Sequence, residues 1–199
     1  MYKYFLILFF LSLFFLKIIN DFEYMDNQTY NVYLIANNKD LSDDYIKKIN
    51  LIKPLKKDKI VRFNHSGNGK IFNNKVNIAV FRRNKISYWG FRKPIWNFLN
   101  SKNVILLGKS KFFKNSVRYF KEKNNQVKCI LYKSKKIKTP SSGFIIIKYF
   151  LKNPNVDKIY LVGFDFHSDQ RLNHGDKHWH NFYNEEKFIK KYPNKIIQL

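Results

Sequence analysis

The chain has 199 residues, which is enough for one domain with a buried core. Its hydrophobic content of 45% and aromatic content of 18% exclude a globally disordered protein. The formal net charge of +24 predicts attraction to polyanions, such as nucleic acid, anionic lipid headgroups or phosphorylated glycans.

Lysine carries most of this charge. Arginine, the usual reader of bases and clamp of phosphates, occurs only at Arg62, Arg82, Arg83, Arg92, Arg118 and Arg171. Lysine, asparagine, isoleucine and phenylalanine are all abundant together, as is typical of an AT-rich genome. We therefore attribute the excess of lysine mainly to composition and not to a dedicated nucleic-acid function.

The N-terminus is apolar over residues 4 to 16, YFLILFFLSLFFL, with Lys3 before the run and Lys17 after it. The run is slightly shorter than the roughly 20 residues that span a bilayer, but lysine side chains can extend its reach. No small-residue cleavage site follows. The sequence predicts an uncleaved signal-anchor over residues 1–19, with a cleaved signal or a hydrophobic core element as alternatives, and a short polar stem over residues 20–30. The chain is therefore expected to be a single-pass membrane protein.

From residue 31 onward, short apolar runs alternate with amphipathic ones. The runs that predict strands are 31–36, 59–64, 76–81, 103–108, 127–132 and 158–164. The runs that predict helices are 43–52, 112–123 and 142–152. This alternation predicts one catalytic domain over residues 31–199 with an α/β fold, a Rossmann-like and mostly parallel sheet flanked by helices.

Cys129 is the only cysteine, which excludes an intrachain disulfide and a cysteine-based zinc site. It lies in the apolar run VKCILY, so we expect a buried structural thiol on a strand.

In sheets of this kind, ligands bind beyond the carboxyl ends of the strands. The segments that follow the predicted strands are small and polar, and suit a nucleotide sugar: NNKDLS, NHSGNG, PSSG and DFHSD. In PSSG, Ser141 or Ser142 is expected to cap the following helix, and Gly143 to let a ligand approach the backbone. The free amide groups at that helix start predict a site for a carboxylate or phosphate, although an ordinary helix cap has the same pattern.

Four segments occur in an order that resembles the sialyltransferases. TPSSG (139–143), an apolar helix and VDKIYLVGFDF (156–166) resemble the small sialylmotif. YLIANN (33–38) followed by DKIVRFN (58–64) is similar to the large sialylmotif, and His180 with Glu185 fits the very small motif. Over residues 31–190 the chain thus resembles glycosyltransferase family 29, with similarity to the bacterial family 42.

This resemblance implies particular roles for several residues. Asn38 and Asn64 correspond to donor-binding asparagines, although Asn64 also fits a plain turn. Asp165 would lie on the donor side of the site, or cap a loop. His180 would be the general base that accepts the acceptor's hydroxyl proton, with Glu185 orienting or stabilising that region near the start of the next helix.

The sequence departs from the family pattern at three points. Asn37 replaces the glycine before Asn38, and Lys39 replaces the serine or glycine after it. The disulfide of the vertebrate enzymes is absent because Cys129 stands alone. The chain is short, so we expect reduced acceptor-recognition loops.

The histidine-rich stretch HGDKHWHNFYNEEKF (174–188) allows three interpretations. His174, His178 and His180 could bind zinc together with Asp176, but Gly175 and Asp176 disfavour the helix that such a site needs. Alternatively, the neutral imidazole of His180 moves a proton, or the stretch is a solvated loop. We favour proton transfer and predict no metal site.

The sequence thus predicts an inverting, metal-independent glycosyltransferase without a cofactor. It would transfer sialic acid, or a related acidic sugar, from a CMP-sugar donor to a glycan or glycolipid acceptor. The predicted donor-binding residues are Asn38, Asn64, Ser141, Ser142, Gly143 and Asp165. The alternative is a membrane-anchored basic protein that binds polyanions without catalysis.

Overall fold

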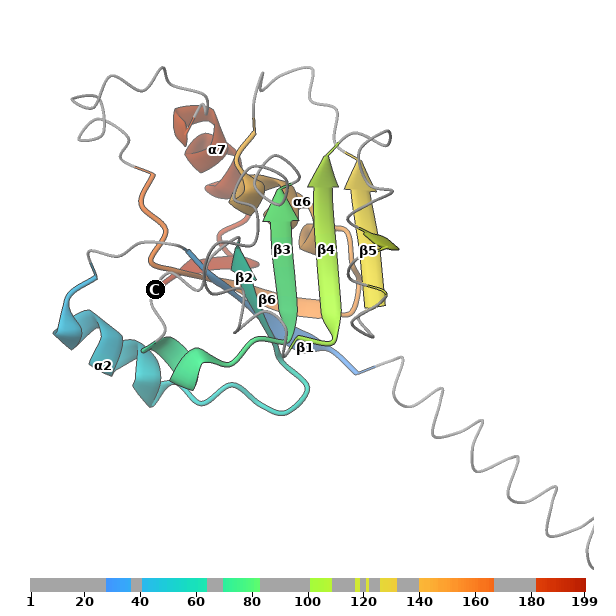
Figure 1. Cartoon of the computed structure of the whole chain (residues 1–199). Coiled ribbons are helices and arrows are strands. Elements are labelled where there is room, and N and C mark those ends of the chain that lie inside the picture. The colour runs from blue at the N-terminus through green and yellow to red at the C-terminus, as the bar shows by residue number, and fades with distance from the viewer. Residues whose placement is uncertain are drawn as a thin grey trace, which may run out of the picture.

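The computed structural model describes residues 28–36, 41–63, 70–82, 101–108, 117–118, 121, 126–131, 140–166 and 182–199 (Figure 1). In this part of the chain, seven parallel strands form one sheet in the order β5-β4-β3-β2-β1-β6-β7. The strands are β1 (Tyr30–Ile35), β2 (Lys59–Phe63), β3 (Ile78–Arg82), β4 (Asn103–Gly108), β5 (Gln126–Leu131), β6 (Val156–Val162) and β7 (Ile196–Gln198). The predicted Rossmann-like α/β fold is confirmed.

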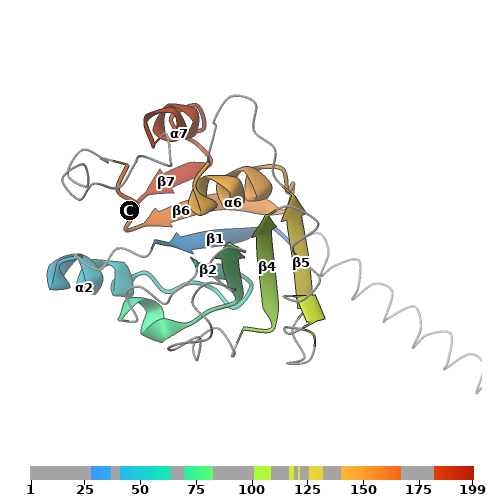
Figure 2. The ribbon, with the colours of Figure 1, turned by 45° about the horizontal axis from the view of Figure 1, so that its top comes forward.

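Among the described residues, three continuous α-helices and one 3-10 turn accompany the sheet (Figures 1 and 2). They are α2 (Asp43–Leu51), η1 (Ile71–Asn74), α6 (Ser142–Leu151) and α7 (Phe182–Ile189). Of the predicted helix over 112–123, residues 117, 118 and 121 are described, and these are helical. Within the described residues, no helix is long and apolar enough to cross a bilayer, and the predicted anchor lies outside them.

The two faces of the sheet are buried by different helices. Along β1, Val32 and Leu34 face a core shared with α6 and α7, whereas Tyr33 and Ile35 face a core shared with α2 and η1. This alternation follows from the two-residue period of a strand. Because a fully buried aliphatic side chain contributes roughly 1.5–3 kcal/mol, the central strands supply much of the stability.

A change of direction in the strand order divides the sheet between β1 and β6. From β1 the chain adds β2, β3, β4 and β5 on one side, and then returns to add β6 and β7 on the other. The segments that follow β1 and β6 lead to opposite sides of the sheet, so a crevice lies between the carboxyl ends of these two strands. Such a crevice is the usual ligand position in open α/β sheets.

Two charged residues of the segment 58–64 are buried and serve the fold. The carboxylate of Asp58, 2% exposed, accepts hydrogen bonds from the amides of Asn31 and Leu55 at 2.9 Å each. The guanidinium of Arg62, 1% exposed, donates to the carbonyl oxygens of Ile71 at 2.6 Å and Lys75 at 3.2 Å. Arg62 therefore holds η1 against the sheet.

The η1 turn is strained. Its residues Phe72, Asn73 and Asn74 have φ values of 49°, 48° and 59°, in the left-handed region that non-glycine residues rarely adopt. Asn50 supports the turn, because its side chain accepts from the Phe72 amide at 2.7 Å and donates to the Lys70 carbonyl at 3.0 Å.

The prediction of a buried thiol was wrong. Cys129 is on β5 as predicted, but β5 is at the edge of the sheet and the Cys129 side chain is exposed. Lys128, Cys129 and Leu131 of this run are exposed, but the run has the composition of a buried strand, so composition alone did not distinguish the two.

Candidate functional site at the carboxyl edge

Because the strands are parallel, their carboxyl ends form one edge of the sheet, which we call the carboxyl edge. The helix α6 begins at this edge, shortly after Pro140. Ser141 is its N-cap: the Ser141 Oγ accepts the amide proton of Phe144 at 3.0 Å. Of the two serines that the sequence offered as caps, Ser141 therefore fills this position, and Ser142 is the first helical residue. Donor contact by Ser141, Ser142 or Gly143 stays a prediction.

Glu185 is the residue that joins this helix start to α7. It lies in the first turn of α7 and is 0% exposed. One carboxylate oxygen accepts the Ser141 amide proton at 2.7 Å, and the other accepts the Ser141 hydroxyl proton at 2.6 Å. The two residues are 44 positions apart in the chain, so this pair fixes two distant segments against each other.

Burial raises the pKa of the Glu185 carboxyl, because a charge loses its hydration in the interior. The two hydrogen bonds from Ser141 and the positive charge of Arg82 act in the opposite direction and favour the carboxylate. Burial is the largest of these effects. Glu185 is thus a carboxyl group held by donors, and not a solvated surface charge.

Arg82 is a residue of this site that the sequence analysis did not single out. It is the last residue of β3, and its guanidinium donates a hydrogen bond to the carbonyl oxygen of Pro140. Arginine at the carboxyl end of a central parallel strand is a signal that could have identified it, because such positions face the ligand edge.

Gly143 is in close contact with an aromatic ring. A Cβ atom at Gly143 would lie 2.6 Å from the Cε1 atom of Phe164, which is closer than carbon atoms pack. Phe164 follows β6, and its ring also packs edge-on against Phe63 with 6.2 Å between ring centroids. The sequence predicts that Gly143 lets a ligand approach the backbone; in the structure the Phe164 ring occupies the space beside Gly143.

Asp165 is exposed and directly follows Phe164 beyond the end of β6, at the carboxyl edge as predicted. The backbone before it turns at Gly163, whose φ is 68°. The amide of Gly163 donates to the Tyr45 hydroxyl at 2.9 Å, and this hydroxyl donates to the Leu199 carbonyl at 2.7 Å. Tyr45 of α2 therefore fixes the backbone beside the crevice between β1 and β6.

Several predicted site residues lie outside the part of the chain that the structure describes. These are the donor-binding candidates Asn38 and Asn64, the general base candidate His180, and the zinc candidates His174, His178 and Asp176. Their roles stay predictions. The described site consists of the α6 start, Glu185, Arg82 and the Phe164–Asp165 segment.

Comparison with models of known protein families and with curated proteins finds no match for this sequence. Among solved structures, the apo crystal structure of an α-2,3-sialyltransferase from Campylobacter jejuni is similar, with a TM-score of 0.53 and 15% sequence identity. The similarity covers 87% of this chain and 76% of that enzyme. At this identity the likeness shows the fold: the chain has a sialyltransferase-like α/β fold, and the likeness does not fix the family.

Proposed function

We propose that this protein is a glycosyltransferase that moves sialic acid, or a related acidic sugar, from a CMP-sugar to a glycan acceptor. The observation that carries the proposal is the Ser141–Glu185 contact. The sequence motifs assign these two residues to one site, and the Ser141 Oγ lies 2.6 Å from a carboxylate oxygen of Glu185 at the carboxyl edge of the sheet. The sialyltransferase-like fold supports the same assignment.

In this mechanism the start of α6 binds the anionic part of the donor. The amides of Ser142 and Gly143 belong to the first helical turn, where no intrahelical acceptor is available. These amides and the helix dipole stabilise negative charge on the CMP phosphate as it leaves. Arg82 adds positive charge at the same edge, Asn38 and Asn64 hold the nucleotide, and Asp165 orients the donor sugar.

On the acceptor side, His180 removes the proton of the attacking hydroxyl. The hydroxyl attacks the anomeric carbon as the bond to CMP breaks, which inverts the configuration. Glu185 does not touch the reacting atoms; it positions Ser141 and thereby the α6 start. We also propose that residues 1–19 anchor the protein in a membrane.

Calorimetric titration of the full-length chain in neutral detergent with CMP tests the donor assignment. We expect saturable binding below millimolar CMP, and weaker binding after Ser142→Ala. UMP is the matched control nucleotide. Absence of saturable CMP binding at millimolar concentration would contradict the proposal.

The general base is tested by comparing three histidine variants. His180→Ala is expected to lower turnover roughly 10²–10⁴-fold with little change in CMP affinity, because a base acts in the transition state. His174→Ala and His178→Ala should be milder. Equal losses in all three variants would favour a shared metal or collapse of the loop.

Chelation tests the absence of a catalytic metal. The sequence has no Asp-x-Asp site for a nucleotide–metal complex, so we expect activity to survive EDTA. Loss of activity that zinc or manganese restores would assign the histidines to a metal site.

A further inference from the structure

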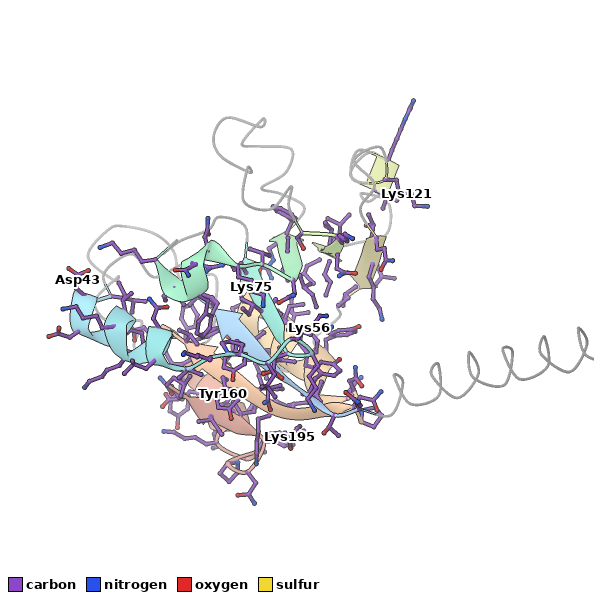
Figure 3. All side chains as sticks on the ribbon, turned by 90° about the horizontal axis from the view of Figure 1, so that it is seen from below. Asp43, Lys56, Lys75, Lys121, Tyr160 and Lys195 are labelled. Atoms are coloured by element: carbon purple, nitrogen blue, oxygen red, sulfur yellow. The ribbon has the colours of Figure 1, made fainter. Side chains whose placement is uncertain are left out.

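The opposite edge of the sheet carries features that the proposed transfer reaction does not use. Because all seven strands are parallel, the residues that precede each strand lie at one edge, which we call the amino edge. Lysines precede or begin several strands here: Lys56, Lys57 and Lys59 at β2, Lys75 before β3, Lys102 before β4 and Lys195 before β7. Figure 3 looks at the molecule from this side and labels Lys56, Lys75 and Lys195.

Carboxylates offset little of this charge among the described residues of the amino edge. Asp58 is buried, and both of its oxygens accept backbone amide protons. Asp157 is exposed on β6 and is the other carboxylate at these strand starts. The edge is therefore strongly cationic.

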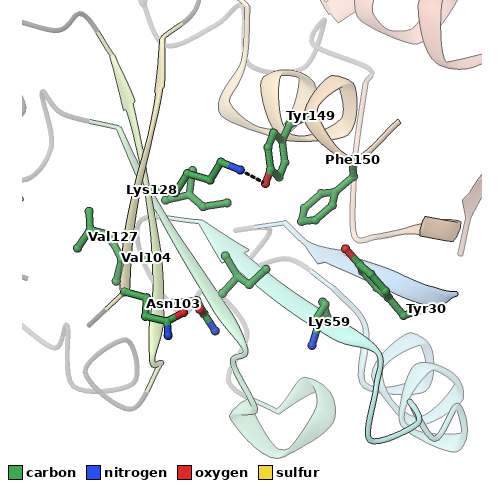
Figure 4. Close-up of a pocket in the computed structure, with 11 residues that line it drawn as sticks. Tyr30, Lys59, Asn103, Val104, Val127, Lys128, Tyr149 and Phe150 are labelled. Carbon is green, nitrogen blue, oxygen red and sulfur yellow. Dashed lines mark hydrogen bonds between the residues drawn. The ribbon is translucent and has the colours of Figure 1, made fainter. Parts of the chain in front are cut away.

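A cavity of about 430 Å³ opens at this edge, between the first residues of β1 to β5 and the end of α6 (Figure 4). Its walls combine the aliphatic side chains of Ile78 and Ile105 with the aromatic rings of Tyr30, Tyr149 and Phe150, all on the face of the sheet that α6 covers. No aspartate or glutamate is among the described residues that line it.

Two lysines of the cavity are held by aromatic rings. The Lys128 Nζ donates to the Tyr149 hydroxyl at 2.8 Å and lies 4.8 Å from the ring centroid. The Lys59 Nζ lies 5.6 Å from the centroid of the Tyr30 ring. Cation–π contacts orient an ammonium group over the face of a ring, so these contacts hold both lysine side chains at the cavity.

Exposed leucines lie beside the lysines of the same edge. Leu51 is 79% exposed and Leu55 is 57% exposed, on either side of the exposed Lys53. The Leu55 amide is tied to Asp58, directly before β2. Leucines among lysines favour the interface of an anionic bilayer, where both the apolar and the charged groups find partners. Nucleic acid offers no comparable partner for the leucines.

The path of the chain also favours a bilayer at the amino edge. Tyr30 lines the cavity and begins β1, so the preceding segment reaches the domain at the amino edge. That segment includes the apolar run of residues 4 to 16.

We propose that the amino edge contacts an anionic membrane and that the cavity lined by Lys59 and Lys128 binds the phosphate of one phospholipid headgroup. The phosphate ester is the recognised group, and the headgroup of an anionic lipid is its source. The carboxyl edge with Glu185 then faces away from the bilayer.

The test is calorimetry of the full-length chain in neutral detergent, titrated with dihexanoyl-phosphatidylglycerol. We expect saturable binding that is at least about fivefold weaker in Lys59→Gln/Lys128→Gln, since each lysine near an anionic lipid contributes about a factor of five. Asn103→Asp is a smaller change that places a carboxylate at the cavity and should also weaken binding. The matched control Lys47→Gln/Lys48→Gln, on the exposed face of α2, removes the same charge outside the cavity and should bind as the unchanged protein does.

Each other result has a defined meaning. Equal losses in the cavity and control pairs would show general charge attraction and overturn the site. Equally tight binding of glycerol phosphate or inorganic phosphate would assign the cavity to a free phosphate and overturn the lipid. Tighter binding of random-sequence duplex DNA, lost in the cavity pair, would make the edge a nucleic-acid surface. Retained CMP binding in the cavity variants separates this test from the proposed transfer reaction.

Discussion

Glu185 is a buried carboxyl group of α7 that holds the start of α6 in place. A carboxyl group with 0% exposure is costly unless donors surround it, and Ser141 supplies two of them. The Ser141 hydroxyl in turn accepts from the Phe144 amide. This chain of hydrogen bonds makes the position of the α6 start depend on α7.

Two substitutions separate the geometry of Glu185 from its charge. Glu185→Ala leaves the Ser141 donors without a buried acceptor, which should cost about 1–3 kcal/mol of unfolding free energy and weaken CMP binding. Glu185→Gln keeps an acceptor, and should keep most of the stability and CMP affinity. Urea unfolding and CMP titration of both variants measure these effects; equal weakening of CMP binding by both would contradict a positioning role.

The raised pKa of Glu185 gives this comparison a pH dependence. The folded protein releases the Glu185 proton at higher pH than the unfolded chain does, because burial disfavours the charge. The wild type should therefore lose stability relative to Glu185→Gln as the pH rises from the ordinary glutamate value through the raised one. Melting temperatures of both proteins across this range measure it, and a difference independent of pH would contradict it.

Gly143 and Phe164 form a second residue-scale pair. Gly143→Ala should destabilise the protein by about 1–3 kcal/mol, because the new methyl group would lie 2.6 Å from the Phe164 ring. Phe164→Leu makes room, so the double variant should lose less than the sum of the two single variants. Urea unfolding of the three variants tests this, and simple additivity would exclude the steric account.

At the scale of elements, Arg62 holds the strained η1 turn in place. Arg62→Met keeps the bulk but removes the donors to the carbonyl oxygens of Ile71 and Lys75. We expect a loss of about 2–4 kcal/mol in unfolding free energy. Lys48→Met, on the exposed face of α2, removes one positive charge as a control and should change stability by less than about 0.5 kcal/mol.

The elements were predictable where one pattern dominated. Each of the six predicted strands is present within two residues, because buried parallel strands give continuous apolar runs. β7 has only three residues, too few for any periodicity, and three of the four residues of η1 are left-handed, which no apolar pattern specifies. The prediction that Cys129 is buried was wrong because an apolar run does not reveal the order of the strands, and that order puts β5 at an edge of the sheet.

The site was predictable only in part, for a reason that belongs to the whole molecule. Ser141 and Glu185 could be assigned to one site from motif spacing and resemblance. Arg82 could not, because its contact with Pro140 depends on how β3 and α6 meet in space. The packing of Phe164 against Gly143 likewise arises from the return of the chain through β6.

Alkaline pH provides a test of the folded molecule as a whole. Burial raises the pKa of Tyr33 to about 12, with the charges of Asp58 and Tyr160 adding to the effect, and burial also raises the pKa of Tyr30 and Tyr45. Between pH 10 and 12 the folded state keeps tyrosine protons that the unfolded chain has lost, so stability should fall as the pH rises. Melting temperatures at pH 9 to 12, with ultraviolet titration of tyrosinate, measure this; Tyr33→Phe should show a smaller fall.

The position of β1 between β2 and β6 has a consequence for biosynthesis. During translation, β1 can pair with β2 soon after both emerge, but its other edge has no partner until residues 156–162 have been made. The hydrogen bond from the Tyr45 hydroxyl forms later still, since its acceptor, the Leu199 carbonyl, is 154 positions further along the chain. An unpaired central strand edge of buried aliphatic residues is prone to association with other chains. The nascent chain is therefore expected to fold late and to depend on chaperones until residues 156–199 have left the ribosome.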